Sequence, residues 1–217
     1  MGFSYVVEHM EDDEETDKAI PDWVELEYRH MRTLAGPDAR VLFTHLSQSS
    51  SKSLSNVFSD DSSTSLASAS AYQIGVLELM KQNNIPLNKV CLLDPKAEKE
   101  LAPVDGDGEF EWFLFGGILG DDPPRDRTSE LRKLGFPTRH LGNIQMTTDT
   151  ALGVTKLVVQ DRKKLTEIPY VDLPTIKFNT KESVEMPFRY ISKDGEPILP
   201  SGMRELLYED LNKSFDF

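Results

Sequence analysis

The stretch FEWFLFGGILG at residues 110–120 decides the fold class of this chain. Its first half, residues 110–115, has the length and apolar character of a buried β-strand, and a glycine-rich turn follows directly at residues 116–120. In open α/β sheets, ligands bind where parallel strands end, and glycine lets the backbone approach them there. The turn matches neither the G-x-G-x-x-G dinucleotide fingerprint nor a phosphate loop, so taken alone it also fits an ordinary tight turn.

Strand and helix patterns alternate on both sides of this stretch. We expect strands at residues 3–7, 41–44, 89–93, 110–115 and 138–141. We expect helices after Asp22, at residues 72–82 and 125–134, from residue 147 onward, and at residues 203–212. In the helix after Asp22, the candidates for the buried stripe are Trp23, Leu26 and Met31. This alternation predicts an α/β fold with a mostly parallel sheet and helices on both faces.

The remaining segments suggest one domain with a tail. Residues 11–18 are strongly acidic and are expected to form a solvated loop. Twelve of the 24 residues at 47–70 are serine, so we expect a disordered insertion there. Prolines become frequent after Ile168. We therefore expect a domain at residues 1–176 and an extended tail at residues 177–217 that packs on it.

Charge limits the classes of partner. The chain has 37 acidic and 24 basic residues and a net charge of −13, which would mostly repel nucleic acid and attract a cationic protein. Acidity that serves only solubility is the alternative. The single cysteine, Cys91, lies in an apolar run and predicts a core residue without a disulfide. We expect a cytoplasmic protein with no membrane span and no metal site.

Two turns follow neighbouring strands, since Gly142 and Asn143 come directly after the expected strand at residues 138–141. A pair of such turns favours a pocket for a nucleoside. Carboxylates flank both turns and the end of the first strand. They are Asp121, Asp122, Asp126, Asp149 and Glu8.

Two blocks around these turns carry a resemblance to a known family. They are FLFGGILGDDPPRDRT at residues 113–128 and RHLGNIQMTTDTA at residues 139–151. They resemble the cofactor half of a SPOUT methyltransferase, and most closely the fungal and archaeal family that methylates an arginine of a small-subunit ribosomal protein. The segments at residues 5–11, 185–190 and 200–206 are also similar to that family, so the resemblance covers nearly the whole chain outside the serine-rich segment.

The resemblance implies a SPOUT fold with a C-terminal deep trefoil knot and S-adenosyl-L-methionine as the cofactor. The implied cofactor-binding residues are Phe115, Gly116, Gly117, Ile118, Leu119, Gly120, Leu141, Gly142, Ile144, Met146, Thr147 and Thr148. Methylation of arginine requires that the guanidinium be oriented and lose a proton, and carboxylates serve both needs. The catalytic candidates are therefore Asp126, Asp149 and Glu8, with His9 and His140 as alternative bases.

Two other functions stay open at this point. Most SPOUT relatives methylate tRNA or rRNA, although the basic clusters in this chain are short and mixed with acids. A non-catalytic knotted domain that binds during ribosome assembly is the second alternative. We expect a monomer, because the long tail could cover the surface that SPOUT dimers bury, and a dimer is the alternative.

Overall fold

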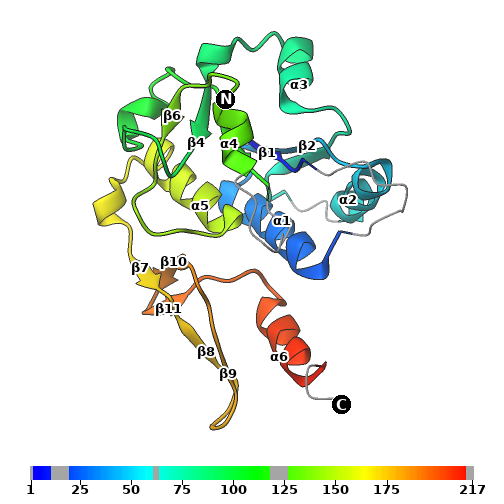
Figure 1. Ribbon diagram of the computed structural model, residues 1–217, viewed down its shortest axis with the longest axis vertical. Coiled ribbons are helices and arrows are strands. Elements are labelled where there is room, and N and C mark those ends of the chain that lie inside the picture. The colour runs from blue at the N-terminus through cyan, green and yellow to red at the C-terminus, as the bar shows by residue number, and fades with distance from the viewer. Residues whose placement is uncertain (1, 11–19, 61–63, 118–126, 214–217) are drawn as a thin grey trace.

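A computed structural model describes residues 2–10, 20–60, 64–117 and 127–213 of the chain. Its centre is a six-stranded sheet in the order β3-β2-β1-β5-β4-β6, in which every pair is parallel (Figure 1). The strands are β1 (Ser4–Glu8), β2 (Arg40–Thr44), β3 (Ser68–Ala71), β4 (Val90–Leu93), β5 (Trp112–Gly116) and β6 (Thr138–Arg139). All of the predicted strands are present, and β3 is an additional one.

The central strands are apolar on both faces because both faces are covered. In β1, Tyr5 and Val7 point into one core and Val6 into the other, and all three are fully buried. Successive side chains of a strand alternate between faces, so a strand buried on both faces has a continuous apolar run rather than alternation.

Helices cover both faces of the sheet, which confirms the predicted α/β architecture. The larger core packs α1 (Asp22–Ala35), α2 (Gln48–Asp60) and α5 (Thr148–Val159) against the sheet. The smaller core packs α3 (Val76–Asn83) and α4 (Arg127–Arg132) against the opposite face. Three short 3-10 helices connect these elements at Leu87–Lys89, Pro103–Gly106 and Leu165–Glu167.

Helix α1 is present where it was predicted, but its buried stripe differs from the one expected. Trp23 and Leu26 are only partly buried. The buried positions are Val24, Glu27, Tyr28, Met31, Arg32 and Ala35. Four of them, at residues 24, 27, 28 and 31, follow the i, i+3, i+4, i+7 spacing of one helix face, and one of those four is a glutamate.

The prediction of a disordered insertion at residues 47–70 is wrong. Most of this segment forms α2 and β3, and residues 61–63 lie outside the described part of the chain. Leu54 and Phe58 lie one turn apart on α2 and anchor it in the larger core. The Ser55 hydroxyl donates to the Ser51 carbonyl at 2.7 Å, so this serine finds its hydrogen-bond acceptor within the helix itself. The serine-rich composition predicted disorder wrongly, because two apolar residues spaced one turn apart are enough to hold α2 against the sheet.

The segment after Ile168 folds instead of remaining extended. Its strands are β7 (Tyr170–Asp172), β8 (Thr175–Lys177), β9 (Ser183–Glu185), β10 (Arg189–Lys193) and β11 (Glu196–Pro197), and α6 (Met203–Lys213) follows. One small sheet has the order β11-β10-β7, and β8 pairs with β9 as an antiparallel hairpin. These elements lie beside α5 and α1 in Figure 1. Because β7 pairs with β10, the proposed boundary at residue 176 runs through one small sheet.

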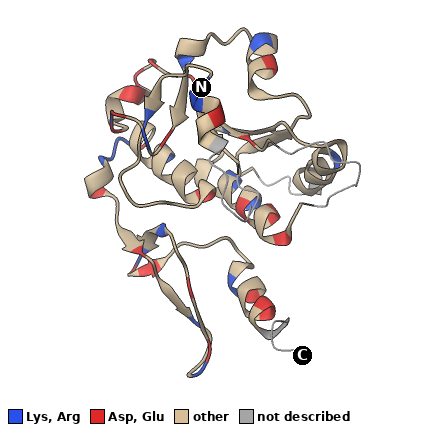
Figure 2. Ribbon diagram, viewed as in Figure 1, with Lys and Arg blue, Asp and Glu red and all other residues tan. Residues whose placement is uncertain are grey.

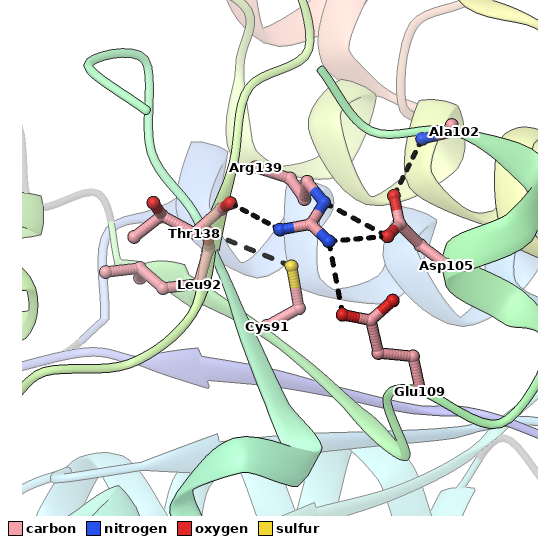
Figure 3. A network of polar contacts seen from close by, with 7 residues as sticks. All are labelled: Cys91, Leu92, Ala102, Asp105, Glu109, Thr138 and Arg139. Atoms are coloured by element: carbon pink, nitrogen blue, oxygen red, sulfur yellow. Dashed lines mark hydrogen bonds and ion pairs between the residues drawn. The ribbon is translucent and has the colours of Figure 1, made fainter. Parts of the chain in front are cut away.

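An ion-pair network fixes the end of β6, where the second turn begins (Figure 3). The Arg139 guanidinium lies 2.8 Å from Asp105 and 3.3 Å from Glu109, and it stacks 5.1 Å above the Phe110 ring. Burial lowers the pKa of Arg139, but the bond to Asp105 outweighs it and leaves the pKa above its ordinary value. Cys91 lies in the same region as a fully buried free thiol whose pKa burial raises, which agrees with the predicted core role.

Candidate functional site

The first turn packs directly against the end of β1. In the parallel register Glu8 is opposite Gly116, and the Gly117 N–H donates to the Glu8 carbonyl at 2.7 Å. A Cβ at Gly117 would lie 2.7 Å from His9 Cα and 2.9 Å from the Glu8 carbonyl oxygen. Only glycine fits there, so the first predicted turn depends on close backbone approach.

Glu8 is buried at this edge and its carboxylate is fully used. It accepts hydrogen bonds from the Thr44 hydroxyl and from the Val76 N–H at 2.9 Å, and His45 Nδ1 lies 3.2 Å from its other oxygen. The Val76 N–H is an unpaired donor of the first turn of α3, so Glu8 caps that helix from another strand. If Glu8 takes part in catalysis, one of these hydrogen bonds must first break.

The second turn leaves β6 and forms a partly buried loop at residues 140–147. Gly142 has a φ of 104°, a conformation that side chains rarely adopt, and its N–H donates to His140 Nδ1 at 3.1 Å. Ile144 is partly buried, and Leu141 and Met146 pack partly against the larger core. The loop therefore presents apolar side chains next to exposed backbone, a combination typical of nucleoside pockets.

The loop ends at the N-terminus of α5. The Thr147 hydroxyl donates to the Thr150 hydroxyl at 2.8 Å, and the Ala151 N–H donates to the Thr147 carbonyl. Thr147 and Thr148 are both buried. Together with the preceding loop, they bring six of the twelve predicted cofactor-binding residues into one continuous segment.

Strand β10 covers this loop, a contact that the sequence did not predict in detail. The Arg189 N–H donates to the Gln145 carbonyl at 2.8 Å, and Arg189 bridges Met146 in parallel. The Arg189 guanidinium pairs with both oxygens of Asp172 at 2.6 and 2.9 Å and stacks 4.6 Å above the Tyr170 ring. The hydrogen bond from Arg189 holds the pKa of Asp172 below its usual range, and burial raises that of Tyr170 to about 12.

A second acidic centre lies between α1, α5 and β10, which we call the α1–α5 polar cluster. It consists of Glu27, His30, Asp149 and Tyr190. His30 Nδ1 and Asp149 Oδ2 share a hydrogen bond of 2.7 Å. Burial, and next the charge of Asp149, raise the pKa of Glu27 well above its ordinary value. Burial, then Asp149 and Glu27, raise the pKa of Tyr190.

Of the catalytic candidates that the structure describes, Asp149 alone belongs to this cluster. Glu27, His30 and Tyr190 were missed, although a glutamate within an apolar helical stripe is a visible signal for Glu27. His9 is also buried, and its Nδ1 shares a 2.6 Å hydrogen bond with the Tyr28 hydroxyl.

Several predicted residues cannot be assigned a place. Ile118, Leu119, Gly120, Asp121, Asp122 and Asp126, and the acidic loop at residues 11–18, lie outside the described residues. The Phe115 side chain packs in the larger core, so its backbone is the part that reaches the edge. Within the described ranges, no group of three or more potential metal ligands forms, and no helix is long and apolar enough to cross a membrane.

Comparison with known proteins gives a consistent result. A family model described as "Protein arginine N-methyltransferase SFM1-like" matches residues 4–214. Protein arginine N-methyltransferase SFM1 of Saccharomyces cerevisiae is 39% identical over 220 residues, which is 98% of this chain and 97% of the relative.

Solved structures agree with this match. The crystal structure of yeast SFM1 with SAM superposes with a TM-score of 0.78 at 34% identity, over 97% of this chain and 92% of that one. A dual-specific Trm10 of Thermococcus kodakaraensis superposes with a TM-score of 0.51 at 21% identity, over 77% and 96% of the two chains. This second likeness concerns the fold alone.

Proposed function

Because this chain belongs to the SFM1-like family of protein arginine N-methyltransferases, we propose that it methylates an arginine of a basic protein of the small ribosomal subunit, using S-adenosyl-L-methionine. Family membership gives the enzyme class, a protein arginine methyltransferase. The ribosomal substrate rests on the family resemblance of the sequence and on charge.

The fold is that of the SPOUT superfamily, as the resemblance implied. The deep trefoil knot remains a prediction, since residues 118–126, between β5 and α4, lie outside the described part of the chain.

The second turn has the right composition to hold the proposed cofactor. Leu141, Ile144 and Met146 supply apolar surface for an adenine, and the left-handed Gly142 leaves the backbone accessible beside them. Thr147 and Thr148 would close the site at the start of α5, and by the family resemblance the backbone of Phe115, Gly116 and Gly117 would form another wall. The bound cofactor supplies an electrophilic methyl group on a sulfonium.

Of the two proposed catalytic carboxylates that the structure describes, Asp149 has the surroundings that better suit the role. It follows Thr148 directly and lies at the buried start of α5, one of its oxygens bonded to His30. Glu8 lies at the neighbouring strand end but is committed to three partners. Asp126 stays a prediction from the sequence.

A groove between α1 and α6 supports the proposal that the partner is cationic. It has a volume of about 310 Å³, and its lining residues are Asp22, Glu25, Leu26, Gly202, Glu205, Leu206 and Glu209. Figure 2 shows acidic residues on both helices. Among the described residues, the lining holds four carboxylates, no lysine or arginine, and two leucines for aliphatic stems, so it suits a basic protein segment. One of the four, Glu25, already pairs with Arg29 at 3.1 Å.

The cover of β10 over the cofactor loop comes from the same chain, which supports the proposed monomer. We propose a cytoplasmic location, because ribosomal proteins are synthesised in the cytoplasm, where this enzyme would meet its substrate.

The test is transfer of labelled methyl from S-adenosyl-L-methionine to purified small-subunit ribosomal proteins, with deproteinised rRNA and tRNA in parallel. We expect label on one arginine of a basic ribosomal protein. The variant Ile144→Arg should abolish it, while Val104→Arg, at a residue 61% exposed, should not. Label on RNA would contradict the proposal, and absence of both label and cofactor binding would favour a binding module.

A further inference from the structure

Leu173, between β7 and β8, has a backbone conformation that is costly for a leucine. Its φ is 49°, in the left-handed region that glycine, asparagine and aspartate adopt most readily. Its side chain is 60% exposed, so packing offsets little of the strain. Strain of this kind persists only where the surrounding structure imposes it, and it is concentrated at functional sites.

The other non-glycine residues with a positive φ, among those that the structure describes, each have a local reason for it. They are Met10, His45, Asn84, Arg162 and Asp194. The histidine, the asparagine and the aspartate are of types that tolerate this conformation. The methionine is buried in the smaller core, and the arginine is held by hydrogen bonds to Asp107 and to a backbone carbonyl. Leu173 has neither burial nor a favourable side-chain type.

The ribbon around Leu173 imposes its conformation. β7 pairs with β10 with Asp172 opposite Arg189, and the pairing of β8 with β9 starts at Thr175. Between these two pairings, two residues of one strand lie opposite three of the other, which is a β-bulge. The Leu173 N–H donates to the Phe188 carbonyl at 3.0 Å and so holds the strained residue in place. Glycine would fit this position without strain, so the backbone does not require a leucine.

The bulge adjoins the strand that covers the proposed cofactor loop. Asp172, the neighbour of Leu173, accepts both bonds from the Arg189 guanidinium, and the Arg189 N–H donates to the Gln145 carbonyl of that loop at 2.8 Å. The β8–β9 hairpin continues from the bulge away from α5 (Figure 1). A small cofactor bound at the loop leaves this ribbon free, whereas a protein substrate extends beyond the transferred methyl group. Leu173 is therefore placed for the segment that flanks the substrate arginine.

We propose that Leu173 contacts the protein substrate, and that its side chain packs against an apolar residue beside the methylated arginine. This inference rests on the proposed function. The bulge fixes the Leu173 backbone before the substrate binds, so the contact costs little conformational entropy. The groove between α1 and α6 selects by charge, and Leu173 adds selection by the sequence around the arginine.

Three variants separate the side chain from the strain. Leu173→Gly removes both, Leu173→Ala removes most of the side chain and keeps the strain, and Leu173→Met keeps a long apolar side chain. Each is compared with wild type in methyl transfer to purified small-subunit ribosomal proteins, S-adenosylhomocysteine binding by calorimetry, melting temperature and sedimentation. The matched control is Val104→Ala, which shortens an apolar side chain that is 61% exposed.

For Leu173→Gly and Leu173→Ala we expect KM for the protein substrate to rise about tenfold, the effect of losing one buried apolar contact. The values of kcat and of S-adenosylhomocysteine affinity should not change. Leu173→Met should keep KM within about twofold of wild type. Leu173→Gly should melt about 2 °C above Leu173→Ala, because only glycine relieves the strain. Val104→Ala should behave as wild type.

An unchanged KM in Leu173→Gly and Leu173→Ala would overturn the inference. A loss of S-adenosylhomocysteine affinity would also overturn it, since Leu173 would then support the cofactor loop. Sedimentation of wild type as a dimer that Leu173→Gly dissociates would mean that a second copy of the chain covers this side chain. A wild-type enzyme that labels no ribosomal protein would reject the proposed function and this inference with it, so the two failures are distinguishable.

Discussion

Glu8 and Glu27 are equally buried, at 5% exposed each, yet their surroundings differ completely. Glu8 is held by the Thr44 hydroxyl, the Val76 N–H and His45, so its charge ties β1, β2 and α3 together. Glu27 has one oxygen without a partner and a second carboxylate nearby. Burial alone therefore does not identify a functional carboxylate. The count of satisfied oxygens separates the carboxylate that joins three elements from the one that keeps an unpartnered oxygen.

The largest effect should come from removing the satisfied carboxylate. Glu8→Ala leaves the Val76 N–H and the Thr44 hydroxyl buried without an acceptor, so we expect the free energy of unfolding to fall by about 3 kcal/mol. Urea denaturation at neutral pH measures this change, and the control is Glu78→Ala, which alters an exposed glutamate of α3. A loss below about 1 kcal/mol would place Glu8 among the residues that serve function rather than structure.

The unsatisfied carboxylate should behave in the opposite way. The pKa of Glu27 is raised in the folded protein, so its contribution to stability is complete below the ordinary value of 4.5 and is lost as pH rises through the folded value. Glu27→Gln removes this loss. The stability of the variant relative to wild type should therefore grow by about 1.4 kcal/mol per pH unit across that window.

Urea denaturation of both proteins at several pH values between 4 and 8 checks this difference. If the free energies of unfolding of wild type and Glu27→Gln changed with pH in the same way, burial of the Glu27 carboxylate would carry no measurable cost. The contrast drawn with Glu8 would then be wrong.

A smaller effect is expected where β10 covers the proposed cofactor loop. Arg189→Gln removes the paired bonds to Asp172 and the stacking on Tyr170, but Asp172 is 42% exposed and water screens the pair. We expect S-adenosyl-L-methionine to bind about fivefold more weakly, equivalent to about 1 kcal/mol. Calorimetry should find no change for Arg162→Gln, which removes an exposed pair with Asp107. Equal affinities for wild type and Arg189→Gln would leave β10 without a role in cofactor binding.

Exposed carboxylates should matter least, and through salt-dependent attraction. Reversing charge in the groove with Glu205→Lys and Glu209→Lys should raise KM for the protein substrate about threefold at low salt and leave kcat unchanged. The difference should shrink at high ionic strength. Glu98→Lys with Glu111→Lys, outside the groove, provides the control. A change in kcat of the groove variant would mean that these residues reach the transfer site.

The sequence predicted the sheet well because its strands have clear apolar runs. Apolar runs predict buried strands most clearly at Val90–Leu93 and Trp112–Gly116. The glycine-rich turn after the second strand predicts the edge of the sheet at which a ligand would bind. Strand order could not be read from one sequence, because pairing between distant strands leaves no local pattern. Helix α2 was missed since its anchor is only Leu54 and Phe58 among serines.

Prediction of the site was limited for a different reason. Asp149 was selected because it follows a turn, which is a local signal. Tyr190 joins the same cluster only through the pairing of β10 with the rest of the chain, and nothing near residue 190 announces it. Glu27 was within reach, because it interrupts the apolar positions Val24, Tyr28 and Met31, but of the stripe predicted for that helix only Met31 lies on the buried face.

The bridge between Met146 and Arg189 also has a consequence for how the protein is synthesised. A chain made from its N-terminus can form β1 through α5 early, since all of these elements precede residue 160. The part of β10 that covers the proposed cofactor loop and the phenol of the α1–α5 polar cluster come about thirty residues after α5, at positions 189 and 190. Translation that stops before them would leave this loop uncovered and the polar cluster without the Tyr190 phenol.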